Sequence, residues 1–327
     1  MNGFEVSTNT YAVKELLGLG GSITNNTGAT GADGFLPKIG RWLNVYSLDR
    51  YAVTNKGIDG KDSWYSLIRL QTDVIDLAPD LIIYDCAIND NDQSPYAKCE
   101  EAVIRRLRTA LPDAKIAGII FGTTANRLGT DPTNTKATTA AQVREILTHY
   151  GILYADQTAA VVTSVNAGTY TLAQIFADTI HPADVGHLLG KQTLDDVIPT
   201  ALTQTLPSLP TPLHDTAGDY SQTPIIRVAN DNDGETGVWA ESGTDEASST
   251  ADSTITWTGA FSSFGFDTGY GASQTYAWQI DGGAWTNVSP STVGYTNNLL
   301  WSGARGAHTV VVKVVTGTIT VKRFLAV

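Results

Sequence analysis

The sequence predicts an α/β domain built on a parallel sheet, followed by a separate all-β domain. In the first two-thirds of the chain, short apolar runs typical of buried strands alternate with segments of helical period. Prolines then punctuate the stretch 206–212, which is typical of a linker. Beyond it the chain is rich in Ser, Thr, Gly and Trp, with short alternating runs between turn signals, which indicates a β-sandwich or jelly roll.

The elements of the first domain follow from local patterns. Leu16–Leu19 is an apolar run that ends at two glycines and predicts a strand followed by a sharp turn. Strands are also expected at 51–54, 80–87, 114–121 and 152–155, and helices at 34–44, 62–77, 95–110, 136–150 and 184–199. Because such an alternation forms a parallel sheet, the loops after its strands should gather at one edge.

We therefore expect an α/β domain over residues 1–204, a linker over 205–222 and a β-sandwich over 223–327. Since 327 residues exceed one typical domain, the length agrees with two.

The net charge of the chain limits which kinds of molecule it can bind. The chain has 33 acidic and 21 basic residues, a net charge of -12. This sign argues against nucleic acid or an anionic membrane as a partner. No apolar stretch is long enough to span a bilayer. Residues 1–15 show no signal peptide, and an extracellular or virion-associated location is favoured without being fixed.

Ser22 follows the first predicted strand and its two glycines. A serine on such a turn has its hydroxyl held at the sheet edge, which suits a nucleophile. It still needs a base and donors for an oxyanion. Asp178 lies three residues before His181, in a loop before a helix. There the carboxylate can fix the histidine tautomer and leave the other ring nitrogen as a base. The alternative is a helix start at which an aspartate only caps.

Taken together, these motifs resemble the SGNH (GDSL-type) hydrolases over roughly residues 15–200. The resemblance rests on Gly20-Gly21-Ser22, Gly60, Asn89 and Asp178-x-x-His181-Pro182, in the family's order and approximate spacing. It implies a three-layer, flavodoxin-like α/β fold and a serine ester hydrolase. It also implies that Ser22, Asp178 and His181 are catalytic, and that Ser22, Gly60 and Asn89 form the oxyanion hole. No cofactor is expected.

Two positions depart from the family pattern. Gly21 stands where the family has an aspartate before the nucleophile, so support of the turn differs. Ile88 stands where a glycine usually precedes the asparagine, which affects the close backbone approach there.

No metal site is expected. His187 with His181 would be a zinc pair, but no third ligand cluster accompanies them, and packing at the helix start is the better interpretation. The stretch 230–235, Asn-Asp-Asn-Asp-Gly-Glu, faintly resembles a calcium loop but lacks the full ligand spacing, so a solvated turn is preferred.

The C-terminal part resembles, more loosely, the galactose-binding-like jelly rolls attached to some carbohydrate esterases, over about 235–325. Its five tryptophans fit either sugar stacking or, preferably, core packing: Trp239, Trp257, Trp278, Trp285 and Trp301. Glycan binding by this domain is left open.

The sequence thus predicts an esterase that removes short acyl groups from O-acylated carbohydrate or another small ester. The first alternative is a lipid esterase, lysophospholipase or thioesterase. An alternative of another class is a non-catalytic carbohydrate-binding or virion adhesin protein.

Overall fold

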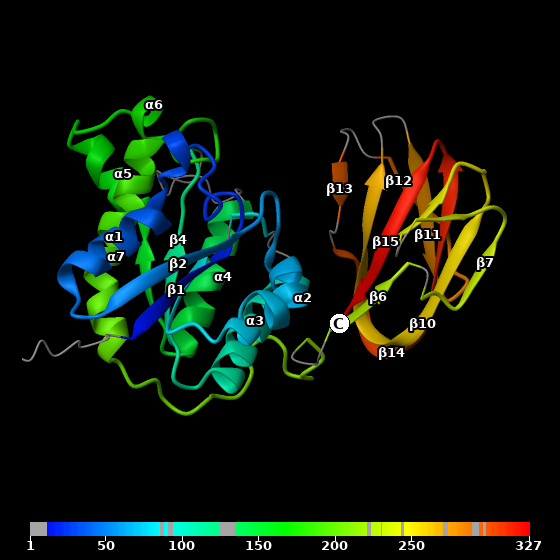
Figure 1. Ribbon diagram of the computed structural model, residues 1–327, viewed down its shortest axis with the longest axis horizontal. Helices are drawn as coiled ribbons and strands as arrows, with labels where there is room; N and C mark the ends of the chain where they lie inside the picture. Colours follow the sequence, from blue (N-terminus) through cyan, green and yellow to red (C-terminus); the bar gives the residue numbers. More distant parts are fainter. Residues whose placement is uncertain are drawn as a thin grey trace, which may run out of the picture. The chain divides into compact units, whose positions relative to one another are not determined.

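The structure is a computed structural model with two compact units (Figure 1). It describes residues 12–85, 88–90, 94–124, 135–220, 224–229, 231–242, 245–270, 274–289, 294–296 and 299–327. The first unit consists of the described parts of 1–63, 71–92 and 106–210. The second consists of the described parts of 64–70, 93–105 and 211–327. The expected boundaries after residues 204 and 222 stay a prediction.

The first unit is built on a five-stranded parallel sheet in the order β2-β1-β3-β4-β5. Its strands are β1 (Val13–Gly20), β2 (Arg50–Gly57), β3 (Leu81–Asp85), β4 (Lys115–Ile120) and β5 (Leu153–Asp156). The residues of β3 are all buried, as expected for a central strand with both faces covered. This order is that of a doubly wound sheet. Strand β2 is added on one side of β1 and strands β3 to β5 on the other, so the strand order reverses between β1 and β3.

Helices cover both faces of this sheet. Figure 1 shows α1 and α7 on one face and α4 on the other. The helices are α1 (Phe35–Tyr46), α2 (Ser63–Asp73), α3 (Ser94–Ala110), α4 (Thr135–His149), α5 (Gln157–Asn166), α6 (Leu172–Ile175) and α7 (Asp184–Thr203), with 3₁₀ turns η1 (Thr30–Ala32) and η2 (Ile75–Leu77). Apolar side chains of β1, β3, β4, α1 and α7 form one core cluster. The expected α/β fold is confirmed.

Five elements differ from expectation. The helices α5 and α6 were not predicted, and α7 continues four residues beyond the expected end at residue 199. The expected helix 62–77 ends already at Asp73 and is followed by the 3₁₀ turn η2, and the expected strand 51–54 continues to Gly57. Pro199 lies inside α7, so the helix tolerates one missing main-chain donor near its end. Cys86 and Ala87, in the expected strand 80–87, lie outside the described residues.

The strands of the second unit all pair in antiparallel fashion. They are β6 (Ile225–Val228), β7 (Gly234–Thr236), β8 (Ala240–Ser242), β9 (Asp245–Ser248), β10 (Thr254–Tyr270), β11 (Thr275–Ile280), β12 (Thr286–Val288), β13 (Gly294–Thr296), β14 (Leu299–Thr316) and β15 (Ile319–Ala326). The long strands β10 and β14 shift register near Ser263 and Gly265, and such bulges bend a strand. The core under them is aromatic, with the ring of Trp257 stacked on Phe324.

In the part of the chain that the structure describes, no helix is long and apolar enough to cross a membrane.

Within the second unit, Glu101 on α3 binds the segment 213–215, which precedes the β-strands. Its buried carboxylate accepts hydrogen bonds from three successive main-chain N–H groups, those of Leu213, His214 and Asp215, at 2.5, 2.7 and 2.6 Å. Hydrogen bonds to a charged acceptor are stronger than neutral ones, so this carboxylate fixes where the segment begins.

We expect Glu101→Gln to lower the free energy of unfolding by about 1–3 kcal/mol, because an amide offers one neutral acceptor oxygen to three main-chain donors. Urea unfolding measures it. The matched control is Glu241→Gln at an exposed position, which should change stability by less than about 0.5 kcal/mol. Equal effects of the two substitutions would refute the role given to Glu101.

Candidate active site

The candidate site lies where the strand order reverses. Ser22 follows the carboxyl end of β1, and Asn89 follows that of β3, the strand paired with it. In open α/β sheets, ligands bind beyond the carboxyl ends of the strands at this switch point. The topology therefore brings two of the expected site residues to one edge of the sheet, although they are far apart in the sequence.

Ser22 sits on a tight turn that starts at the end of β1. The carbonyl of Gly21 accepts from the N–H of Asn25 at 3.1 Å, and that of Ser22 from Thr27 at 3.0 Å. Below the turn, the hydroxyl of Thr24 donates to the buried carboxylate of Asp85 at 2.8 Å. These contacts fix the backbone on which the Ser22 side chain is carried.

Asp178 and His181 share one short closed loop. The loop is closed by an isolated bridge between Phe176 and Pro182, with the Ala177 N–H donating to the His181 carbonyl at 2.9 Å. Inside it, Oδ1 of Asp178 accepts from the N–H groups of Ile180 and His181, both at 2.7 Å. The main chain thus orients the carboxylate through Oδ1, which leaves Oδ2 for a side chain.

The three side chains form one hydrogen-bonded chain. Nδ1 of His181 lies 2.7 Å from Oδ2 of Asp178, and Nε2 lies 2.9 Å from Oγ of Ser22. A carboxylate next to Nδ1 requires the proton there, so the neutral ring accepts the Ser22 hydroxyl at Nε2. Ser22 is only 4 % exposed, whereas the side chains of His181 and Asp178 are 22 % and 54 % exposed. The series of hydrogen bonds therefore runs from a buried serine to an exposed aspartate.

The pKa of Asp178 is lowered to about 2, first by the hydrogen bond from the His181 main chain, with further contributions from the imidazole and from the N–H of Ile180. Its carboxyl therefore stays ionised at any pH well above 2, and can stabilise an imidazolium beside it.

Gly60 and Asn89 lie on neighbouring turns. Gly60 is exposed with φ of 68°, a conformation that favours glycine. Asp59 beside it accepts from the Asn25 amide at 2.9 Å and from the Thr27 hydroxyl at 3.1 Å, which ties this turn to the loop after Ser22. Asn89 donates through Nδ2 to the carbonyl of Lys61 at 2.9 Å. Sequence reasoning missed Asp59, since a loop aspartate carries no signal of its partner.

Gly21 lies against the side chain of Asn89. A Cβ added there would lie 2.5 Å from Nδ2 of Asn89, so the amide at the end of that side chain would have to shift. Because the family pattern combines an aspartate at this position with the same asparagine, this contact does not explain the glycine.

His187 is buried in the core. Its Nε2 lies 3.1 Å from the Thr27 carbonyl, and its Nδ1 accepts from the Phe35 N–H at 3.3 Å. Both ring nitrogens have main-chain partners, so the ring packs at the start of α7 as expected. Among the described residues, no three His, Cys, Asp or Glu side chains are grouped as a metal site requires.

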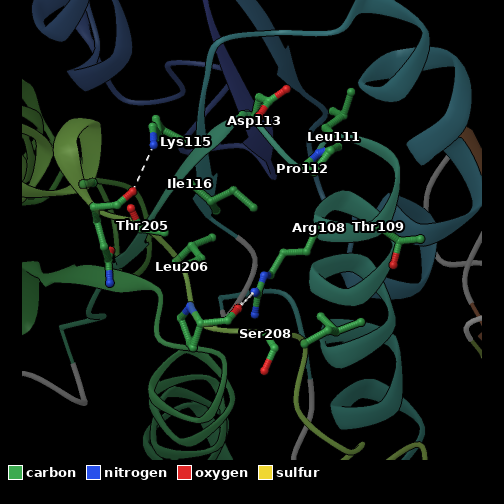
Figure 2. Close-up of a pocket in the computed structure, with 15 residues that line it drawn as sticks. Arg108, Thr109, Leu111, Pro112, Asp113, Lys115, Ile116, Thr205, Leu206 and Ser208 are labelled. Atoms are coloured by element: carbon green, nitrogen blue, oxygen red, sulfur yellow. Dashed lines mark hydrogen bonds between the residues drawn. The ribbon is translucent and has the colours of Figure 1, made fainter.

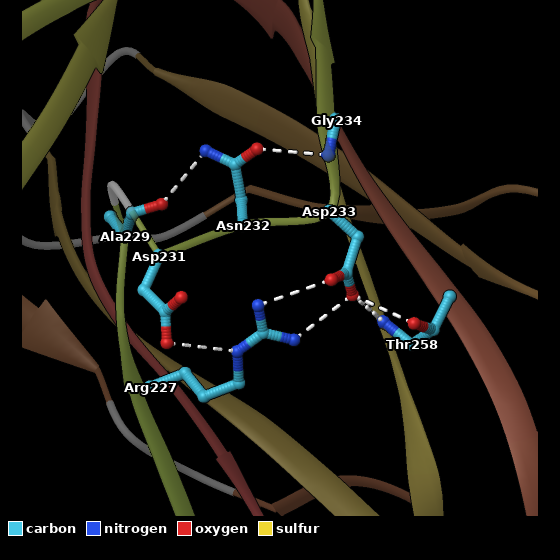
Figure 3. Close-up of polar contacts among 7 residues, drawn as sticks. All are labelled: Arg227, Ala229, Asp231, Asn232, Asp233, Gly234 and Thr258. Carbon is cyan, nitrogen blue, oxygen red and sulfur yellow. Dashed lines mark hydrogen bonds and ion pairs between the residues drawn. The ribbon is translucent and has the colours of Figure 1, made fainter.

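The stretch 230–235 is held by an arginine (Figure 3). Arg227 forms ion pairs with Asp231 at 3.2 Å and Asp233 at 2.9 Å, and lowers the pKa of Asp233 to about 2. Asn232 donates to the Ala229 carbonyl at 3.0 Å. Two carboxylates that would serve as calcium ligands are therefore both paired with one guanidinium. Asn230 lies outside the described residues.

Most of the C-terminal tryptophans belong to the core. Trp257 and Trp278 are buried, and Trp239 and Trp301 pack against the same cluster. Trp285 is 39 % exposed, and the ammonium of Lys313 lies 4.5 Å from its ring centroid. Core packing accounts for four of the five, and Trp285 alone presents an aromatic ring of this group at the surface.

A cavity of about 470 Å³ lies elsewhere in the first unit (Figure 2). Lys115, the first residue of β4, lines it and donates to the Gln204 carbonyl at 2.9 Å. Arg108 reaches the carbonyls of Tyr150 and Pro207. Because the strands are parallel, this cavity lies at the opposite edge of the sheet from Ser22 and is separate from the candidate site.

Comparison with solved structures shows the same two-part fold. A two-domain esterase active on acetylated mannans, crystallised with mannopentaose, is similar with a TM-score of 0.80 at 18 % identity, over 96 % of this chain and 90 % of that one. A catalytic mutant of an acetylxylan esterase from Geobacillus stearothermophilus matches with a TM-score of 0.50 at 21 % identity, over 57 % of this chain and 95 % of that one. No curated protein matches the sequence.

The comparison with family models bears directly on the first unit. The model of the GDSL-like lipase/acylhydrolase family matches residues 19–189, which is just over half of the chain and includes every expected site residue. The chain therefore belongs to the GDSL-like lipase/acylhydrolase family.

Proposed function

We propose that the protein is a serine ester hydrolase that removes short acyl groups, above all acetyl, from O-acylated carbohydrate. The observation that carries the proposal is the hydrogen-bonded chain from Ser22 Oγ through His181 to Asp178, with separations of 2.9 and 2.7 Å. A serine beside a neutral imidazole that is itself oriented by a carboxylate is the arrangement that nucleophilic acyl transfer needs.

In this proposal His181 is the base and then the acid. Nε2 takes the hydroxyl proton as Ser22 Oγ attacks the ester carbonyl, and it returns that proton to the departing sugar hydroxyl. Water then attacks the acyl-serine, again with Nε2 as the base, and releases the carboxylic acid. Asp178 holds the ring in the required tautomer and stabilises the imidazolium in both steps.

The negative charge that develops on the carbonyl oxygen needs donors held in advance. We assign the main-chain N–H groups of Ser22 and Gly60 and the side-chain amide of Asn89. Two contacts support this assignment. The Asn89 amide already uses one N–H on the Lys61 carbonyl, which fixes the direction of the other, and Asp59 ties the turn of Gly60 to the loop after Ser22. Donors fixed in this way stabilise the transition state without reorganisation.

The loops around Ser22 favour a small acyl group. The described segments 25–33 and 59–63 consist mostly of Asn, Thr, Gly and Asp. Trp64 and Leu67, the large apolar side chains that follow segment 59–63, are both fully buried and offer no surface to an acyl chain. Residues 91–93 and 125–134, from the other loops expected to frame the site, lie outside the described residues. The solved esterases that resemble this chain act, by their titles, on acetylated mannan and acetylxylan.

The second unit is proposed as an accessory domain that meets the carbohydrate. Binding glycan there would raise the local concentration of substrate at Ser22. The net charge of -12 agrees with a neutral polymer as partner. A lipid esterase or thioesterase, and a non-catalytic carbohydrate-binding protein, are the alternatives that the tests below separate.

Ser22→Ala should abolish hydrolysis of p-nitrophenyl acetate and leave the fold intact, because the alanine has no nucleophilic oxygen. Circular dichroism and thermal unfolding check the fold. Ser208→Ala, at an exposed position beside the cavity at the opposite edge of the sheet, is the control and should keep full activity. Activity of Ser22→Ala within tenfold of wild type would remove Ser22 as the nucleophile. A wild-type protein without esterase activity would favour the non-catalytic alternative.

Asn89→Ala and Asn89→Asp should each lower kcat by about 10²–10³-fold with little change in KM, because each removes a donor that acts on the transition state. Aspartate keeps the size of asparagine but adds a negative charge, so it should be no better than alanine. Steady-state kinetics on the acetyl ester measure both. If aspartate retains wild-type kcat, Asn89 does not stabilise the oxyanion.

Acyl preference should fall with chain length, with acetyl well ahead of octanoyl. A longer chain gains ~0.8 kcal/mol per buried CH₂ only where an apolar groove receives it, and the described loops offer none. The measurement is kcat/KM for acetyl, butyryl and octanoyl esters of one alcohol. A profile that rises with chain length would replace the carbohydrate substrate with a lipid.

A further inference from the structure

The loop that leaves Ser22 is fastened to the start of α7 at two points. His187 contacts the Thr27 carbonyl at 3.1 Å through Nε2, and Asp184 accepts from the Thr30 N–H at 2.7 Å. Both residues lie in the first turns of α7, three positions apart, and therefore on one side of the helix. We call Asp184 and His187 the α7 clamp.

The two segments that the clamp joins carry the reacting side chains. Thr27 donates its N–H to the Ser22 carbonyl at 3.0 Å, so a displacement of Thr27 also displaces the backbone of Ser22. On the other segment, His181 lies three residues before Asp184. Gly28, which lies between Thr27 and Thr30 in the loop, has φ of 90°, and a Cβ added there would overlap the Pro182 carbonyl. The loop thus passes against the backbone next to His181.

The polarity of the His187 contacts is fixed by their partners. The Phe35 N–H donates to Nδ1, so the proton of the neutral ring is on Nε2, where it is donated to the Thr27 carbonyl. Burial lowers the pKa of His187, which keeps this neutral form. The ring is therefore a fixed bridge between the start of α1 and the loop after Ser22.

We propose that the α7 clamp is a pair of positioning residues that sets the separation of Ser22 Oγ and His181 Nε2. This inference rests on the proposed function, because it treats that separation as catalytic. Neither clamp residue touches the reacting atoms. A misplacement of about 1 Å in such a pair can cost about 10²-fold in rate.

Two isosteric substitutions of His187 separate the positioning contact from the rest. In His187→Gln the amide nitrogen takes the place of Nε2 and can still donate to Thr27. In His187→Asn the amide oxygen takes the place of Nδ1 and can still accept from Phe35, but the Thr27 contact is lost. We expect kcat to stay within about threefold of wild type for glutamine and to fall about tenfold or more for asparagine, with KM little changed in both.

Thermal unfolding of both variants provides the control for a merely structural role. The clamp requires the difference in kcat to persist when the two melting temperatures are similar. Equal kcat values for glutamine and asparagine, or a loss that follows the melting temperature alone, would overturn it.

The exposed member of the clamp gives a second test that does not depend on a core substitution. Asp184→Asn keeps an acceptor for Thr30, and Asp184→Ala removes it. The alanine variant should lose several-fold in kcat while the asparagine variant keeps it, and the reverse order would overturn the clamp.

Failure of the proposed function would be visible separately. A wild-type protein that hydrolyses no ester overturns that function, while hydrogen exchange in peptides covering 23–34 still tests the clamp. Faster exchange in His187→Asn than in His187→Gln supports it, and equal exchange overturns it.

Discussion

The hydrogen bond between Ser22 and His181 is the constraint on which the site depends. It joins residues 159 positions apart, one after the first strand of the sheet and one before the last helix of the first unit. A bond between two side chains supplies only about 1 kcal/mol, too little to order the loops that carry them. The loops must therefore be ordered by other contacts, and the structure shows how. The Asp178–His181 loop is closed by its own main chain, and the Ser22 turn is closed by N–H groups of residues 25 and 27.

Three aspartates fasten the loop after Ser22 to three different parts of the first unit. Asp85, at the end of β3, accepts from Thr24; Asp59, beside Gly60, accepts from Asn25 and Thr27; and Asp184, on α7, accepts from Thr30. A loop rich in Asn and Thr offers many donors, and carboxylates accept strongly from them. The polar side chains and N–H groups of this loop are thus what holds it in place.

Much of the fold and of the site geometry could be predicted from the sequence. Strand and helix periods indicated the parallel sheet, and the family resemblance placed Ser22, Gly60, Asn89, Asp178 and His181; the fold and the family are confirmed, while the roles of these residues stay predictions. The helix α5 was missed because its Val and Thr residues have low helix propensity, and what supports it is the Asp156 cap and the burial of Val161. The hydrogen-bond partners of Asp59 and His187 could not be predicted, because they depend on how distant loops meet.

The central claim is that Ser22 is a nucleophile activated by His181, and covalent labelling tests it most directly. A fluorophosphonate probe reacts with such a serine without requiring the right acyl group or sugar. Intact-mass and peptide analysis of the native protein should show one adduct per chain, on Ser22, and His181→Ala should slow its formation by orders of magnitude. An adduct at another residue, no adduct, or an unchanged rate in His181→Ala would contradict the account.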